Sequence, residues 1–302
     1  MTIPRIQSGL ITLAALATLL TMARPGEAQA VDPGGVAAPG RETAASPRRS
    51  WELPALGGEG QRREEDLVGD NRQPRWTAHD GFGQLDVYVL PKGTGAVVYE
   101  LRPTLERGGR RTTFATEYQA EFGLPGRLQL GVHAVGEDTA GQGAPGDIDA
   151  QAIAVRWAVA EWGTLWGNPT IEGTWKEASR GADAASLSLL LGGHLASGWH
   201  WATNLSWRRD VGESSDERAW TSGVNYVVKD SRVALGVESR VAAATRPQEA
   251  GSMTLGTLTE VLIGPSLQLR PTRRLHIALV PLVGATQESP TARAVVVAGL
   301  EF

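Results

Sequence analysis

From about Gly83 to the last residue, apolar side chains occur at every second position along most of the chain. This period is that of a β-strand with one half-buried face, because an amphipathic helix would repeat its apolar positions every three to four residues. The stretch 111–124 shows the pattern best. One face carries Phe114, Thr116, Tyr118, Ala120, Phe122 and Leu124, and the other carries Thr113, Ala115, Glu117, Gln119, Glu121 and Gly123. The pattern predicts an all-β fold.

The same alternation predicts about twelve strands, an even number as bacterial barrels require. We expect them to start near residues 96, 111, 127, 148, 169, 184, 199, 218, 232, 258, 275 and 292. No helical pattern of about 10–15 residues interrupts the series, which argues against βαβ units. The segment Gln84–Leu90 (QLDVYVL) is also strand-like, and it could add a strand, displace one or lie across the barrel mouth.

The connections between these strands alternate in length. Short turns are expected at 125–126, 162–163, 196–198, 229–231 and 271–272, and longer polar connections at 136–147, 179–183, 210–217 and 244–257, with brief exceptions at 108–110 and 287–291. Outer-membrane barrels have tight periplasmic turns and longer external loops, whereas a soluble sandwich has no reason to alternate. We therefore predict an antiparallel, transmembrane, up-and-down β-barrel over residues 81–302, with a soluble periplasmic sandwich as the alternative fold.

Two segments precede the predicted barrel. Residues 1–30 contain Arg5, an apolar run at 10–22 and the sequence Ala28-Gln29-Ala30, which together predict a cleaved signal peptide; an uncleaved anchor is the alternative. Residues 31–80 are rich in proline, glycine and charge, so we expect a mostly disordered periplasmic leader. A plug or a partner-binding segment is the alternative for this leader.

Composition excludes several kinds of chemistry. The chain has no cysteine, which rules out disulfides, thiolate metal ligands and a cysteine nucleophile. Its net charge of −4 offers no large basic surface for nucleic acid. The five histidines are scattered, without the spacing of a metal site, so we expect no metal and no cofactor.

Charged side chains lie on the predicted inner faces of the strands. We interpret them as a polar lumen or solute path, and the alternative is that they pair across strands and support the barrel. The candidates are Glu117, Glu121, Arg127, His133, Arg156, His194, Arg208, Glu238, Arg240, Glu260, Arg270 and Arg293.

We predict no enzyme activity. His200, Asn204 and Ser206 share one strand face. His200 and Ser206 are six positions apart, about 20 Å along a strand, so the histidine cannot activate the serine directly. Tryptophans on the apolar faces are expected to form membrane-interface girdles, with sugar stacking as the alternative. They are Trp157, Trp175, Trp199, Trp201, Trp207 and Trp220.

The final segment 292–302 (ARAVVVAGLEF) alternates apolar positions and ends in Phe302. It resembles the C-terminal signal of outer-membrane barrels, which the barrel assembly machinery reads. The resemblance implies an outer-membrane location in a Gram-negative envelope, with the assembly machinery and outer-membrane lipid as partners.

Residues 116–135 (TEYQAEFGLPGRLQLGVHAV) resemble a hairpin of the outer-membrane barrels assigned to the MetA pathway of phenol degradation. Those barrels have a glutamate-rich strand, a Gly-Leu tight turn, an arginine and then Leu-x-Leu-Gly. The resemblance implies a barrel with a transport role and carries no site residues across. The resulting hypothesis is a porin-like passive channel or transporter for a small-molecule solute. The alternative is a structural or binding barrel with a filled lumen in an envelope or export assembly.

Overall fold

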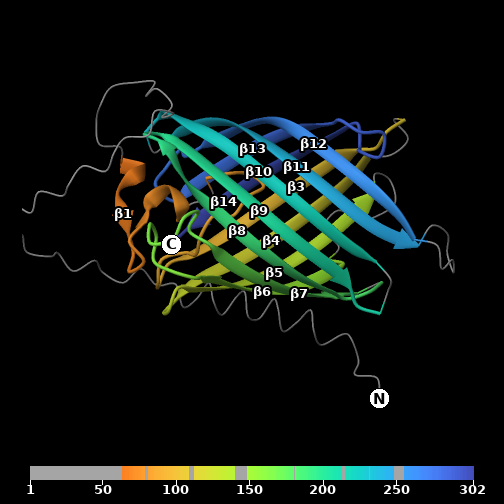
Figure 1. Cartoon of the computed structure of the whole chain (residues 1–302), viewed down its shortest axis with the longest axis horizontal. Helices are drawn as coiled ribbons and strands as arrows, with labels where there is room; N and C mark the ends of the chain where they lie inside the picture. The colour runs from red at the N-terminus through yellow and green to blue at the C-terminus, as the bar shows by residue number, and fades with distance from the viewer. Residues whose placement is uncertain are drawn as a thin grey trace, which may run out of the picture.

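The computed structural model describes residues 63–78, 81–108, 112–139, 148–179, 181–212, 215–230, 232–247 and 255–302. The expected signal peptide and residues 31–62 of the expected leader lie outside these described residues. Within them, twelve antiparallel strands form one closed barrel (Figure 1). This confirms the predicted all-β class and the predicted strand number.

Each barrel strand pairs with its neighbours in sequence, and the last strand, β14, pairs with the first, β3. The largest difference from the expected strand starts is at β12, which was expected from 258 and begins at Leu255. The strands are β3 (Gly95–Leu105), β4 (Thr112–Leu124), β5 (Leu128–Thr139), β6 (Ala150–Ala158), β7 (Thr170–Ala178), β8 (Ala184–Ala196), β9 (Trp199–Asp210), β10 (Asp216–Lys229), β11 (Val233–Pro247), β12 (Leu255–Leu269), β13 (Leu275–Gly284) and β14 (Ala292–Glu301).

The alternating pattern separates an apolar outer face from a more polar inner face. Large outward side chains are exposed, and they include Ile153, Trp157, Trp175, Leu187, Leu205, Trp207, Trp220, Leu235, Ile263 and Leu300. So much exposed apolar surface would be unfavourable in water, but it matches the hydrocarbon that surrounds a transmembrane barrel. Among the described residues, no helix is long and apolar enough to cross a membrane.

Both ends of the strand series meet at the same end of the barrel. The Phe302 backbone N–H donates to the Gly95 carbonyl at 2.9 Å, and the Gly95 N–H donates to the Phe302 carbonyl at 2.9 Å. The Phe302 ring lies 6.0 Å from that of Phe122. We call this end the short-turn end, because it carries the tight β4–β5, β8–β9 and β10–β11 turns, and the opposite end the long-loop end. Short turns are on the periplasmic side in barrels of this kind.

One expected short turn is wrong. A tight turn was predicted at Trp162-Gly163, but β6 ends at Ala158 and β7 begins at Thr170, so the connection is longer. The Trp162 ring packs edge-on against Trp76 at 5.6 Å and against Tyr88 at 5.2 Å. The connection therefore packs against Trp76 and Tyr88 at the short-turn end of the barrel.

The structure also differs from the expected leader over residues 63–78. They form η1 (Arg63–Glu65), β1 (Leu67–Val68), β2 (Gln73–Pro74) and η2 (Arg75–Thr77) at the short-turn end (Figure 1). Trp76 is 2% exposed and packs in a cluster with Phe82, Leu85, Val87 and Ala202. A composition averaged over fifty residues does not reveal one tryptophan that the barrel buries.

Candidate functional site: the barrel lumen

Residues 81–94, which we call the internal segment, run inside the barrel before β3 begins. The strand-like stretch Gln84–Leu90 forms no strand there. The large apolar side chains of the internal segment fill the short-turn half of the lumen. All of them are buried, namely Phe82, Leu85, Val87, Tyr88, Val89 and Leu90. The stretch Gln84–Leu90 therefore neither adds nor displaces a strand, and lies in the mouth and bore of the barrel.

Glu238 anchors the deepest part of the internal segment. This β11 side chain is 0% exposed, and its two carboxylate oxygens accept hydrogen bonds from the backbone N–H groups of Gly83 and Gln84, each at 3.0 Å. On neighbouring β10, the Asn225 side-chain amide donates to the Gly81 carbonyl at 2.5 Å. Each carboxylate oxygen accepts from one backbone N–H group, so neither the carboxylate nor these two N–H groups is buried without a hydrogen-bond partner, which would be costly.

Arg156 on β6 anchors the opposite side of the segment. Its guanidinium lies 2.8 Å from the Asp86 carboxylate and 2.6 Å from that of Glu172, with Glu121 at 3.9 Å. It also donates to the Tyr88 carbonyl at 3.2 Å. The five donors of an arginine can serve several acceptors at once, so one side chain ties the segment to the wall.

Tyr88 and Leu90 add two further anchors. The Tyr88 hydroxyl donates to the Ala160 carbonyl at 2.5 Å, and burial raises the pKa of Tyr88 to about 12, so the phenol stays protonated. The Leu90 N–H donates to the Gln129 side chain on β5 at 2.7 Å. Polar contacts to the segment thus come from strands on several sides of the bore.

The barrel wall has glycine where the internal segment approaches most closely. A Cβ atom at Gly123 on β4 would overlap the Pro91 carbonyl oxygen, and one at Gly192 on β8 would overlap a methyl group of Val87. The missing side chains leave room for the backbone at Pro91 and for the Val87 side chain. The wall and the segment are therefore complementary in shape.

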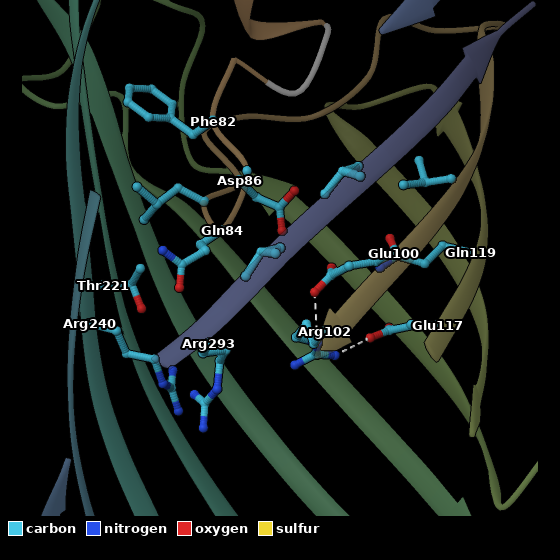
Figure 2. A pocket seen from close by; sticks show the side chains of 15 residues that line it. Phe82, Gln84, Asp86, Glu100, Arg102, Glu117, Gln119, Thr221, Arg240 and Arg293 are labelled. Carbon is cyan, nitrogen blue, oxygen red and sulfur yellow. Dashed lines mark hydrogen bonds and ion pairs between the residues drawn. The ribbon is translucent and has the colours of Figure 1, made fainter. Parts of the chain in front are cut away.

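Beyond the internal segment, toward the long-loop end, lies a cavity of about 300 Å³, which we call the cup. Phe82, Gln84 and Asp86 form its floor, and strands β3, β4, β10, β11 and β14 form its wall (Figure 2). Charged side chains of both signs project into it, which gives it a polar lining.

The charges of the cup form two groups (Figure 2). On one side, Arg102 lies 2.7 Å from Glu100 and 2.8 Å from Glu117. On the other side, the two terminal N–H groups of Arg293 donate to the two carboxylate oxygens of Glu260, at 2.9 and 2.8 Å. Bidentate pairs of this kind fix the position of a charged group. The cup is thus suited to hydrogen-bonding a polar solute.

Arg240 connects the second group to the next strand. It lies 2.5 Å from Glu217 on β10 and 3.5 Å from Glu260 on β12. On the wall near the first group, the His133 imidazole is 2.7 Å from Glu117. The inner charged side chains therefore face a polar lumen and also pair across neighbouring strands.

The structure places most of the predicted site residues on the lumen wall. They are Glu117, Glu121, His133, Arg156, Arg208, Glu238, Arg240, Glu260 and Arg293. Arg208 pairs with Asp210 at 2.9 Å near the long-loop end, away from the cup.

The other predicted site residues lie at the short-turn end. Arg127 is in the β4–β5 turn with a φ of 61°, and its guanidinium donates to the Ala158 carbonyl at 3.2 Å. Arg270 follows the end of β12. His194 lies beside Trp76, with ring centroids 5.6 Å apart. These three do not join the cup.

Sequence reasoning missed the residues that occupy the bore. Asp86 pairs with Arg156, and Phe82 and Gln84 form the floor of the cup, yet none was a candidate. The available signal was the alternation in Gln84–Leu90, which has apolar residues and one acid on a stretch that precedes the first barrel strand. The His200 ring, which shares a strand face with Asn204 and Ser206, stacks on Trp76 at 4.2 Å.

No family model and no curated protein matches the chain. Among solved structures, it is similar to a NanC porin, with 10% identity and a TM-score of 0.47 over 68% of this chain and 98% of the porin. A KdgM porin has 7% identity and a TM-score of 0.45, covering 68% of this chain and 99% of the porin. An outer membrane channel from Pseudomonas putida F1 has 10% identity and a TM-score of 0.47, covering 72% and 98%. Similarities this low assign no solute or activity. The barrel's own even strand number, apolar exterior and polar lumen are the features of an outer-membrane β-barrel.

Proposed function

We propose that this chain is an outer-membrane channel for small polar solutes, and that the internal segment closes it in the conformation described here. The observation that carries the proposal is the cup, a polar cavity of about 300 Å³ whose floor is the internal segment. A solute that reaches the cup from the long-loop end meets charged groups of both signs, and then a segment that is not part of the barrel wall.

The topology supports a movable closure. The internal segment contributes no strand to the barrel, and the wall closes on itself through the pairing of β14 with β3. Withdrawal of the segment would therefore break none of the strand pairs that hold the barrel together. The anchors that would break include the contacts of the segment with Glu238, Arg156 and Gln129, and those with Asn225 and Ala160. Near the end of the segment, Gly93 and Thr94 also exchange backbone hydrogen bonds with Gly123 of the wall.

The energetics favour a closed resting state. Exposing a buried Val, Leu or Phe side chain costs about 1.5–3 kcal/mol, and six buried apolar residues line up along the segment. Spontaneous full withdrawal into water is therefore rare. We infer that opening shifts the segment within the barrel, so that its apolar side chains stay covered.

The route to the membrane is part of the proposal. Residues 1–30 would direct export and be removed, and residues 31–62 would remain in the periplasm. The terminal strand with Phe302 would be read by the barrel assembly machinery, and outer-membrane lipid would surround the apolar exterior.

A filled-lumen barrel is the second candidate function, and the burial of the apolar side chains of residues 82–90 is the observation that favours it. In that case the chain would serve an envelope or export assembly and would pass no solute. The segment would then be a permanent core for the barrel.

Solute uptake by proteoliposomes separates the two candidates. For a channel, small uncharged and zwitterionic solutes of graded size should enter faster than into protein-free vesicles, and uptake should fall as solute size increases. Protein that is folded, as judged by its heat-dependent mobility on gels, but admits none of the solutes would refute the channel and leave the filled-lumen barrel.

A further inference from the structure

A group of metal-type side chains gathers at the β8–β9 turn, outside the cup. His194 and His200 are direct cross-strand partners on this hairpin, and their ring centroids are 5.0 Å apart. The register shifts between His194 and Ala196, and such irregularities redirect side chains at barrel rims. The two imidazoles therefore lie together on the lumen side of the short-turn end.

The N-terminal elements supply a third donor to the same place. Glu65 of η1 accepts a hydrogen bond from the Gly198 N–H, in the turn itself, at 3.0 Å. One ligand atom from each of Glu65, His194 and His200 lies within 4.8 Å of the others. Residues separated by more than a hundred positions in sequence thus meet at one point.

Trp76 supports the arrangement from behind. Its ring stacks on His200 at 4.2 Å with an interplanar angle of 11°, and its indole N–H donates to the His194 Nε2 atom at 3.4 Å. Trp76 is 2% exposed and His200 is 1% exposed, whereas the His194 side chain is exposed. The group is therefore held by packing on one side and accessible to an ion on the other.

We propose that Glu65, His194 and His200 bind a divalent transition-metal ion of the Zn²⁺ class. Two imidazole nitrogens and one carboxylate are a donor set that suits zinc, whose bonds to such ligands are about 2.0–2.2 Å long. Ligand atoms around one zinc ion would then be roughly 3.5 Å apart, so small side-chain rotations would close the site. Water would complete the coordination from the exposed side.

Such an ion would tie η1 to the barrel wall. Glu65 belongs to the N-terminal elements, whereas the two histidines belong to β8 and β9, so the metal would crosslink them. The alternative is an aromatic cluster of Trp76, His194 and His200 that packs without a metal. A bound metal would require the imidazole nitrogens and the carboxylate, whereas an aromatic cluster would require only the packed rings.

Calorimetric titration of Zn²⁺ into tag-free, detergent-folded protein tests the proposal. We expect one saturable site per chain, with Glu65→Gln weakening binding by about tenfold or more, since Gln keeps an acceptor for Gly198 but loses the charge. His200→Phe keeps a ring to stack on Trp76 and removes the ligand, so it should abolish binding in a protein that stays folded. His133→Gln, which changes a histidine in the lumen, should bind as the parent does.

Trypsin digestion gives a second readout. Arg63, Arg72 and Arg75 are cleavage sites in the N-terminal elements, and Zn²⁺ should slow their cleavage in the parent but not in His200→Phe. Absence of saturable binding in the parent would overturn the proposal. So would equal affinity in the parent, Glu65→Gln and His200→Phe, because the ion would then bind elsewhere.

Discussion

Arg156 and Asp86 form an ion pair of 2.8 Å between the barrel wall and the internal segment. Asp86→Asn should loosen the segment, because it removes the charge that the buried guanidinium holds. A hydrogen bond to a charged group contributes about 1.5–3 kcal/mol. Because the Asp86 side chain is 38% exposed, we expect a loss near the lower end of this range. Amide exchange over residues 83–90 should then be roughly tenfold faster. Asp210→Asn removes a similar partner from Arg208 and should leave this exchange unchanged. Equal exchange in the parent and Asp86→Asn would mean that the pair does not hold the segment.

Glu238→Gln should destabilise the closed state more strongly. A glutamine side chain has one acceptor oxygen and one NH2 donor group. One of the two backbone N–H groups, of Gly83 or Gln84, would therefore face the NH2 group and lose its acceptor. A buried unsatisfied donor costs about 1–3 kcal/mol, and we expect a larger open fraction in single-channel recordings. Glu177→Gln on the exposed side of β7 is the matched control. An unchanged open fraction in Glu238→Gln would remove Glu238 from the closure.

The fit between wall and segment can be tested at Gly123. Gly123→Ala places a methyl group against the carbonyl oxygens of Pro91 and Leu90, the latter 2.6 Å away, so the segment must shift. Overpacking of this kind costs about 1–3 kcal/mol, and we expect a lower unfolding temperature by circular dichroism. Gly173→Ala on β7 meets nothing within 4 Å and should unfold as the parent does. The same unfolding temperature for both variants would contradict the described approach.

Phe302 closes the barrel, and Phe302→Ala should impair assembly. The ring packs near Phe122 and Gly95 at the seam of β14 and β3, where Phe302 and Gly95 exchange backbone hydrogen bonds. We expect less heat-modifiable protein in the membrane fraction. Phe114→Ala removes an exposed ring from the same neighbouring strand, β4, and should insert normally. Normal insertion of Phe302→Ala would count against a role of this residue in assembly.

The sequence predicted the barrel well because one physical rule acts along every strand. A one-residue register slip would exchange the two faces, so the alternation assigns each side chain to lipid or lumen. Glu238 and Arg156 were placed on the inner face on this ground, and they lie on the lumen wall.

The sequence could not predict what these residues contact. Glu238 binds backbone amides 155 and 154 residues away, and no local pattern encodes that meeting. Trp76 is buried because a closed barrel provides a place for it, whereas its own neighbourhood has the composition of a disordered segment. His194 and His200 were judged scattered, although a tight turn between two paired strands brings residues six apart face to face.

A reversible crosslink between the internal segment and the wall tests directly whether the segment closes the channel. The chain has no cysteine, and a Cβ atom at Gly192 would lie 3.6 Å from the Cβ of Val87, close to the spacing that a disulfide needs, so V87C with G192C gives one bond between segment and wall. We expect discrete conductance steps in planar bilayers under reducing conditions, as in the parent, and silence after oxidation. Equal conductance in both states, or silence of folded protein in both, would contradict a channel that the internal segment closes.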